Sequence, residues 1–313
     1  MTKTAVNRTG ALSRLTVAAL TAALVATGTS AVAADGPGTT PSKAGKAAAA
    51  FTKAGKAKAP AESGKSAAAN VPGEFRWLHA LDGSTVYEYA PDNAGGYQPR
   101  SWATDQWTYV RHAQQVDSNG DNAVDSLWVW DTDGYMAYSS PTDFAEVGHG
   151  WNIYNKIIST GNLGGAPSGD LIARDAAGDL WLYLGYADGR ITARQKIGAG
   201  WNIYKNIAGS GDYTGDGKQD IVAADNDGVL WLHPGTGDYT KPFAPRVRVG
   251  GGWNTFNNLV GVGDLDRDGT NDMIARGTDG TLWRYSGAGN TTAPFKPRAQ
   301  IGTGGWNSYR LMF

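Results

Sequence analysis

The chain has 313 residues, including 44 Gly, 12 Trp and 14 Tyr, and it has no Cys. Hydrophobic residues make up 41% and charged residues 18%, which supports a packed core and excludes wholesale disorder. Without Cys, disulfides, thiolate nucleophiles and cysteine-ligated metal centres are excluded. The formal charge of −1 is unevenly distributed, because residues 1–71 carry nine Lys/Arg and two Asp/Glu, whereas residues 72–313 carry 19 basic and 27 acidic residues. The acidic part gives no reason to expect nucleic-acid binding, which needs basic surface.

Residues 1–33 have the features of a secretory signal peptide. Three basic residues precede an apolar run over 15–25 that is too short to span a bilayer, and Ala31-Val32-Ala33 supplies a small-residue cleavage pattern. The alternative, a buried N-terminal helix, lacks an amphipathic period and a cap. No other apolar run approaches membrane-spanning length. The sequence therefore predicts a secreted, extracellular protein without a membrane span.

Residues 34–72 are rich in Ala, Lys, Gly, Pro and Ser and are predicted to form a disordered basic tail. A spacer is the simplest role, and the alternatives are an electrostatic tether to anionic polymers or a source of lysines for a crosslinking enzyme. Residues 59–66 fit a relaxed phosphate-loop pattern, A-x-x-x-x-G-K-S. Neither a strand before it nor a helix after it is expected, so nucleotide binding is not predicted.

The remainder of the chain is built from an internal repeat. Five tryptophans mark the units at spacings of 44, 50, 52 and 53 residues, and they are Trp107, Trp151, Trp201, Trp253 and Trp306. The last four stand in a W-N-x-[YF] motif. A full unit continues with small residues, an acidic loop, a D-[LIM]-[IV]-A strand, a turn ending in Gly, an L-W-x-[YH] strand and a last strand before the next Gly-Trp.

Four strands in roughly fifty residues, with no helix, is the period of a propeller blade. Residues 74–101 resemble the back of such a unit, and residues 306–313 supply the first strand that it lacks. The sequence therefore predicts an all-β, five-bladed β-propeller over residues 73–313, with four-stranded blades and one blade closed by both termini. A β-sandwich is the alternative, but it gives no reason for the complementary half-units.

Three of the loops have oxygen-bearing side chains at positions 1, 3, 5 and 9. Ca²⁺ takes 6–8 oxygen ligands, which alternating residues of a turning loop can supply. The alternative is an Asp/Gly-rich turn capped by its own side chains, without metal. A structural Ca²⁺ is predicted at each of the three, and not at the degenerate loop that begins at Asn162. The predicted ligands are Asp264, Asp266, Asp268 and Asp272; Asp212, Thr214, Asp216 and Asp220; and Asp117, Asn119, Asp121 and Asp125.

The D-x-D-x-D-G-x-x-D loop followed by a D-[LIM]-[IV]-A strand resembles the FG-GAP/VCBS repeat family of extracellular β-propellers over about residues 74–313. That resemblance implies a cell-surface or secreted recognition module with calcium loops. The G-W-x-x-[YF] and D-G-x-L-[WY] elements are also similar to tachylectin-like five-bladed lectins, more weakly. The sequence departs from the family pattern in its shorter first unit, in the loop at Asn162 and in the composite unit, which has no acidic loop.

No catalytic motif accompanies the repeat. The acidic residues recur at equivalent positions, as metal loops and turns do, whereas catalytic acids are normally unique within a repeat array. We therefore expect a non-enzymatic, monomeric binding module.

Carbohydrate or a cell-surface polymer is the first predicted ligand, because aromatic faces stack on sugar rings and neighbouring Asn side chains can bind hydroxyls. Repeated weak sites would gain avidity on a polymer. In the alternative, these tryptophans are core residues between blades, as is expected for Trp181, Trp231 and Trp283. The predicted ligand-binding pairs are Trp151 and Asn152, Trp201 and Asn202, Trp253 and Asn254, and Trp306 and Asn307.

Recognition of another secreted protein, such as an exported protease, is the alternative function. Propeller faces suit protein binding, and the acidic net charge favours basic partners. The two functions differ in what they require of the Trp/Asn pairs: exposure on one face favours sugar binding, whereas burial beside an unsymmetrical surface patch favours a protein.

Overall fold

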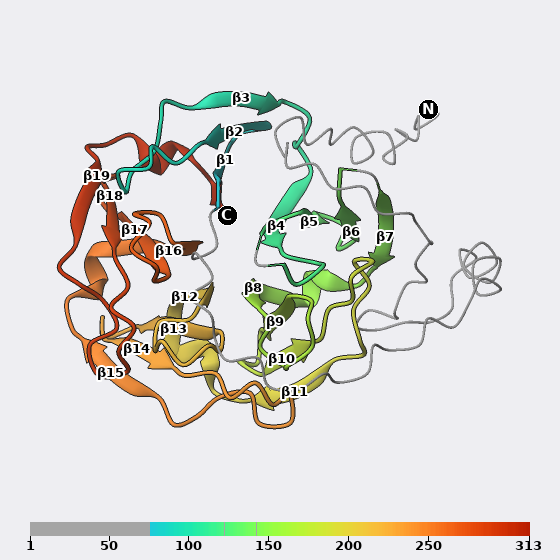
Figure 1. Ribbon diagram of the computed structural model, residues 1–313. Coiled ribbons are helices and arrows are strands. Elements are labelled where there is room, and N and C mark those ends of the chain that lie inside the picture. The colour runs from blue at the N-terminus through green and yellow to red at the C-terminus, as the bar shows by residue number, and fades with distance from the viewer. Residues whose placement is uncertain (1–75, 122, 142) are drawn as a thin grey trace, which may run out of the picture.

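The computed structural model describes residues 76–121, 123–141 and 143–313. It contains five four-stranded antiparallel sheets arranged around a central axis (Figure 1), so the predicted five-bladed β-propeller is confirmed. The signal peptide and basic tail predicted at 1–33 and 34–72 lie outside the described residues. Within the described part of the chain, no helix has the length and apolarity needed to cross a bilayer.

Four blades consist of strands that are consecutive in the chain, with the first strand innermost and the fourth at the rim. Blade 1 comprises β4 (Val110–Val116), β5 (Ser126–Asp131), β6 (Met136–Ser139) and β7 (Phe144–Gly148). Blade 2 comprises β8 (Tyr154–Gly161), β9 (Asp170–Asp175), β10 (Leu180–Tyr183) and β11 (Gln195–Gly198). Blade 3 comprises β12 (Tyr204–Gly211), β13 (Asp220–Asp225), β14 (Leu230–His233) and β15 (Val247–Gly250). Blade 4 comprises β16 (Phe256–Gly263), β17 (Asp272–Gly277), β18 (Leu282–Tyr285) and β19 (Ala299–Gly302).

Blade 5 is the predicted composite of the two ends of the propeller. Its strands are β20 (Leu311–Met312), β1 (Leu78–Asp82), β2 (Thr85–Tyr89) and β3 (Ser101–Thr104). The N–H of His79 donates to the carbonyl of Phe313 at 2.9 Å, and the N–H of Phe313 donates back at 3.0 Å. The Phe313 ring also stacks on Trp107 of blade 1, with ring centroids 5.7 Å apart. The last residue of the chain therefore joins blade 5 to blade 1.

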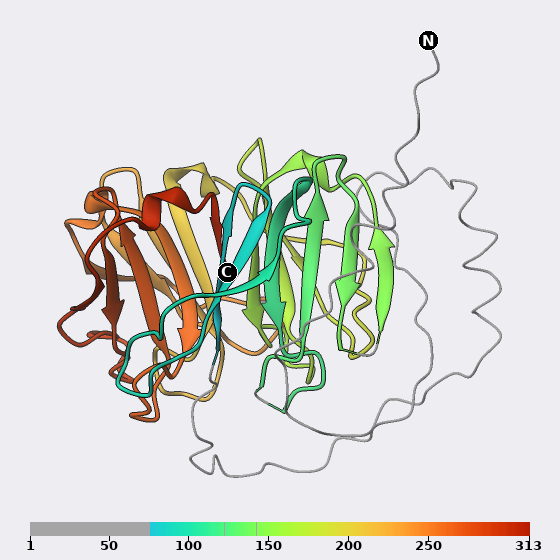
Figure 2. The same cartoon turned by 90° about the horizontal axis from the view of Figure 1, so that it is seen from above.

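The strands run between two faces of the disc (Figure 2). On one face, which we call the tryptophan face, a short 3₁₀ turn beginning at each repeat Trp of blades 2–5 leads into the inner strand. These turns are η1 (Trp151–Ile153), η2 (Trp201–Ile203), η3 (Trp253–Thr255) and η4 (Trp306–Ser308). The glycine before each Trp is left-handed, with φ between 75° and 88°, which explains the Gly-Trp motif because a side chain disfavours this conformation. The opposite face, where inner strands turn into second strands through the acidic loops, we call the acidic face.

In blades 2–5, the repeat Trp packs on the last aromatic residue of the third strand of its own blade. Trp151 lies 4.8 Å from Tyr183 between ring centroids, and Trp253 lies 4.7 Å from Tyr285. His233 takes the same place beside Trp201 at 4.7 Å. This contact explains why L-W-x-[YH] recurs in step with G-W: the two motifs form one aromatic pair inside the blade.

The tryptophans of the third strands were expected to be core residues. The structure places them at the margin of the core. Each is partly buried and packs against a core cluster on one side. The other side is covered by an arginine that precedes the fourth strand, at 3.9–4.2 Å from guanidinium carbon to ring centroid. The three pairs are Trp181 with Arg194, Trp231 with Arg246, and Trp283 with Arg298.

Because Phe313 is buried at the junction of blades 5 and 1, we expect Phe313→Ala to lower the free energy of unfolding by about 3–4 kcal/mol. Phe144, an exposed residue of the edge strand β7, is the matched control, and Phe144→Ala should cost less than about 1 kcal/mol. Urea unfolding followed by tryptophan fluorescence measures both. Equal losses for the two variants would show that closure does not depend on Phe313.

Candidate functional site

A buried aspartate begins the second strand of blades 2, 3 and 4, at the ninth position of each loop on the acidic face. Asp170, Asp220 and Asp272 are each 0% exposed. In Asp272, Oδ1 accepts the N–H of Gly287 at 2.9 Å, and Oδ2 accepts the N–H groups of Leu265 and Asp266 at 3.0 and 3.2 Å. One carboxylate thus joins the loop after the inner strand to the loop after the third strand.

The same three-donor arrangement recurs in the other two blades. Asp220 accepts from the N–H groups of Gly235, Tyr213 and Thr214, and Asp170 accepts from those of Gly185, Leu163 and Gly164. Both oxygens of the predicted ligands Asp220 and Asp272 are therefore occupied by backbone donors. Asp170 makes the same bonds in a loop that has lost its other acidic residues, so the ninth position has a role that does not require a metal ion.

Burial raises the pKa of Asp170 and of Asp220 to about 6 and that of Asp272 to about 7, against the partial opposition of the backbone donors. For Asp272 the neighbouring negative charge of Asp266 acts in the same direction as burial. These carboxylates are thus largely desolvated, and the N–H groups that surround them replace the water that they have lost.

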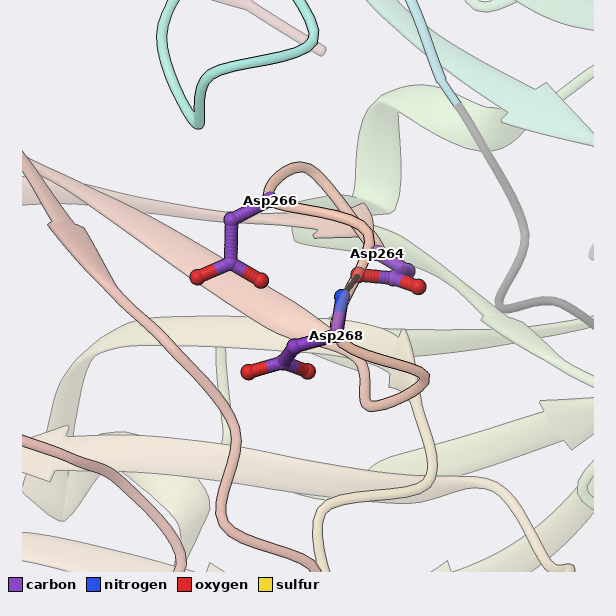
Figure 3. A group of neighbouring side chains, drawn as sticks. All are labelled: Asp264, Asp266 and Asp268. Atoms are coloured by element: carbon purple, nitrogen blue, oxygen red, sulfur yellow. Dashed lines mark hydrogen bonds between the residues drawn. The ribbon is translucent and has the colours of Figure 1, made fainter.

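The loop of blade 4 gathers three carboxylates at its tip. One oxygen from each of Asp264, Asp266 and Asp268 lies within 4.8 Å of the others (Figure 3). Asp264 is 4% exposed, and its oxygens accept the N–H groups of Asp268 and Gly269 at 3.0 and 2.9 Å. The loop backbone therefore fixes the first carboxylate of the cluster.

The second carboxylate of this cluster is held from one side only. Asp266 Oδ2 accepts from Ser286 Oγ at 2.7 Å and lies 3.2 Å from Arg284 Nη2, whereas Asp266 Oδ1 is buried and has no hydrogen-bond partner. The outer oxygen of Asp268 contacts the ammonium of Lys296. An unpartnered buried carboxylate oxygen next to two further carboxylates fits a hard cation with oxygen ligands. Asp272, with both oxygens occupied, is not part of this group.

Among the described residues, the other two predicted loops do not gather carboxylates in this way. Asp212 accepts from three backbone N–H groups of its own loop, and Thr214 Oγ1 donates to it at 3.3 Å. Asp216 pairs with Lys218 at 3.4 Å. These contacts are those of an Asp/Gly turn that is capped by its own side chains.

The loop of blade 1 has similar internal contacts. Asp117 and Asn119 accept the N–H groups of Gly120 and Asp121 at 2.7 and 2.8 Å. Asp121 accepts the N–H of Ala123, and Asp125 accepts bonds from the hydroxyls of Ser118, inside the loop, and Ser126, directly after it. Residue 122 of this loop lies outside the described residues.

The predicted ligand-binding tryptophans lie inside the blades. Trp151, Trp201, Trp253 and Trp306 are only 2–8% exposed. Their faces are covered by aromatic side chains of the same blade, as Trp306 is by Tyr89 at 4.7 Å between centroids. The indole rings therefore cannot stack on a sugar without repacking of the blade, and they act as core residues, which was the alternative considered from the sequence.

The asparagines that follow these tryptophans are exposed, and they connect neighbouring blades. The side-chain amides of Asn202, Asn254 and Asn307 donate to the carbonyls of Ala176, Asp227 and Thr278, each in a turn of the preceding blade, at 2.9–3.2 Å. Asn152 lies against the equivalent turn at Gly134. The W-N motif thus encodes a contact between blades.

Exposed apolar side chains, which the sequence analysis did not single out, occur two positions after the repeat Trp on one side of the tryptophan face. Tyr109, Ile153 and Ile203, in blades 1, 2 and 3, are 44–47% exposed. The equivalent residues of blades 4 and 5 are Thr255 and Ser308. We call the first three residues the apolar patch. The sequence did contain a signal for this patch, because the second position after the repeat Trp is apolar in three units and polar in two.

The described fold defines the chain as a five-bladed β-propeller with acidic loops. Residues 212–275 match the family model described as an FG-GAP-like repeat. This match and the five-bladed architecture fit the FG-GAP repeat propeller family, as the resemblance in the sequence implied. No curated protein matches the chain.

Two solved structures of BBS1N in complex with ARL6DN are similar to the chain at low identity. The crystal soaked with mercury shows 12% identity and a TM-score of 0.38 over 72% of this chain and 63% of that chain. The crystal soaked with lead shows 13% identity and a TM-score of 0.35 over 73% of this chain and 62% of that one. The chain thus matches less than two thirds of the length of either.

The three-donor arrangement predicts that Asp170→Asn is destabilising although it is isosteric. An amide has one acceptor oxygen, so at least one buried N–H loses its partner and faces an N–H of the amide, at a cost of about 2–4 kcal/mol. Asp188→Asn, in the loop after the third strand of the same blade, removes only a surface ion pair with Arg190 and should cost less than about 1 kcal/mol. Chemical unfolding checks both values. If the free energy of unfolding of Asp170→Asn lies within about 1 kcal/mol of that of the native protein, Asp170 does not have this role.

Proposed function

We propose that this propeller is a secreted recognition module that binds another protein through its tryptophan face. An FG-GAP propeller suggests a protein-interaction or recognition module, and such repeats are generally non-enzymatic. The observation that carries the proposal is the unsymmetrical apolar patch, which stands beside predicted sugar-binding tryptophans that are buried. A ring of equivalent lectin sites would expose the same side chains in every blade, whereas one protein partner needs a single patch.

We further propose that the module is stabilised by a cation such as Ca²⁺, held by Asp264, Asp266 and Asp268. The support is the convergence of three carboxylates and the unpartnered Oδ1 of Asp266. When bound, the ion would neutralise the mutual repulsion of these groups and link the loop to the blade. We rank the loops at Asp212 and Asp117 below this one, because their side chains already cap their own turns.

Calcium is expected to raise the free energy of unfolding. Extracellular calcium modules bind with dissociation constants of about 10⁻⁴–10⁻³ M, so roughly 10 mM Ca²⁺ should add about 1–3 kcal/mol and raise Tm by several degrees relative to EDTA. Differential scanning calorimetry measures the shift. Asp266→Asn should abolish it, because the buried Oδ1 is lost as an anionic ligand.

Asp188→Asn, on the same face and outside the acidic loops, is the control and should keep the full calcium response. A response that survives Asp266→Asn and disappears in Asp216→Asn would move the ion to the loop of blade 3. A protein with the same Tm in calcium and in EDTA would have no stabilising site.

The apolar patch is tested by giving blades 2 and 3 the residue that blade 4 carries. We expect the double variant Ile153→Thr, Ile203→Thr to fold, since both side chains are exposed, and to weaken capture of the secreted partner at least tenfold, about 1.4 kcal/mol. Quantitative affinity capture from the culture medium, followed by titration of the purified partner, measures the loss.

The control is Tyr239→Thr, which removes a similarly exposed aromatic residue from the acidic side of blade 3 and should leave capture unchanged. Equal capture by the native protein and the patch variant would refute the assignment. Binding to a glycan array that is kept by the patch variant and lost in a folded Trp253→Ala protein would restore the carbohydrate function.

A further inference from the structure

The third strand of blade 4 carries an arginine at a position where the other four blades have no cation. Arg284 stands opposite Ile274 of the second strand, on the side of the blade that packs toward blade 5. Blade 4 therefore departs from the repeat in the same unit in which three carboxylates converge. The equivalent residues of blades 1, 2, 3 and 5 are Tyr138, Leu182, Leu232 and Glu88.

Arg284 reaches from this strand to the carboxylate cluster of the acidic loop. Its Nη2 lies 3.2 Å from Asp266 Oδ2, and the side chains of Arg284 and Asp266 are only 14% and 17% exposed. Oδ2 also accepts from Ser286, whereas Oδ1 of the same carboxylate has no hydrogen-bond partner. A positive charge is thus in direct contact with Asp266, which together with Asp264 and Asp268 forms the proposed calcium site (Figure 3).

The guanidinium of Arg284 is enclosed on its other side by the loop between β2 and β3 of blade 5. Gly95 in this loop has no room for a Cβ atom, because such an atom would overlap Arg284 Nη1. The negative charge of Asp92, in the same loop, also acts on Arg284. Arg284 Nε is buried without a hydrogen-bond partner. The positive charge is therefore fixed between two blades, and it cannot turn out to solvent unless the loop of blade 5 moves.

Blade 1 shows what the same position does without a charge. Tyr138 packs against Gly189 of blade 2 as Arg284 packs against Gly95 of blade 5. The Tyr138 hydroxyl donates to Ser118 Oγ, in the acidic loop of blade 1, at 3.1 Å. In both blades the side chain thus connects the acidic loop to the next blade, and among the five described blades only blade 4 makes this connection with a cation.

We propose that Arg284 competes with calcium for Asp266 and thereby sets the calcium affinity of the blade 4 loop. This inference rests on the proposed calcium site and adds the regulation of that site. Without calcium, the guanidinium neutralises Asp266. With calcium, the fixed guanidinium repels the ion in a partly buried site, where salt and water screen charges weakly. The loop then responds to calcium in the extracellular range of about 10⁻⁴–10⁻³ M and is not saturated below it.

The test is a calcium titration of the protein, as the producing cell processes it, at constant ionic strength. The backbone amide resonances of Asp268 and Gly269, whose N–H groups donate to Asp264, report binding at this loop by NMR. Arg284→Leu gives blade 4 the residue of blades 2 and 3, and it should lower the dissociation constant at least tenfold. In EDTA this variant should unfold at a lower temperature than the native protein, because Asp266 loses its partner.

Two further variants separate this contact from the general effect of charge. Arg284→Lys keeps the charge and should bind calcium within threefold of the native protein. Lys296→Met also removes one positive charge, but this ammonium contacts Asp268 at the exposed edge of the cluster, so its removal should lower the dissociation constant by no more than threefold. A gain of tenfold or more that is confined to Arg284→Leu supports the proposal.

Equal dissociation constants for the native protein and Arg284→Leu, or weaker binding by the variant, would overturn the competition and leave the calcium site in place. An equal gain in Lys296→Met would overturn it as well, since only the total charge of the loop would then matter. If neither the native protein nor Arg284→Leu binds calcium, the proposed calcium site fails and this inference fails with it. The amide spectrum shows whether each variant is folded, and Arg284→Met replaces Arg284→Leu if the latter is not.

Discussion

The buried aspartate at the start of the second strand is the interaction on which blades 2, 3 and 4 depend. One carboxylate accepts two N–H groups from the loop after the inner strand and one from the loop after the third strand. Those loops contain no ladder that could satisfy these donors, and leaving any of them unpaired in a buried position is costly. Because this carboxylate holds the backbone of the loop, the side chains at the first, third and fifth positions of the loop can face one another. In blade 4 that is where Asp264, Asp266 and Asp268 converge.

The number and spacing of the repeated motifs in the sequence were sufficient to predict the fold. The four spacings between the five tryptophans, the four strand patterns in each unit and the complementary half-units at 74–101 and 306–313 led to five blades and to the pairing of β1 with β20. This was possible because a blade is a local structure: its strands pair with sequence neighbours, and the turn between the second and third strands of every blade contains a glycine with positive φ. The one long-range pairing, at the closure, followed from counting the strands that were missing.

The sequence did not reveal which way a repeated side chain points. An Asn after a Trp is equally consistent with a sugar hydroxyl and with a backbone carbonyl of the preceding blade, and only the three-dimensional arrangement shows that Asn202 reaches the carbonyl of Ala176. The aspartates of the acidic loops posed the same problem, because ligands and turn caps share residue types. One signal was available: Asp170 is retained in a loop that has lost its other acidic residues, which points to a structural role for the ninth position.

A ring of similar blades gives a criterion for separating structure from function. A position with the same residue in every unit that has it serves contacts that those units must make, as the repeat tryptophans do in all five blades and the ninth-position aspartates do in the four blades that have this loop. A position that departs from the repeat on one side of the ring, such as Ile153 against Thr255, is not required by the blade, because other blades fold without it. Exposed apolar side chains such as Ile153 and Ile203 are unfavourable in an isolated protein. Their concentration on blades 1 to 3 of one face is therefore best explained by what that face binds.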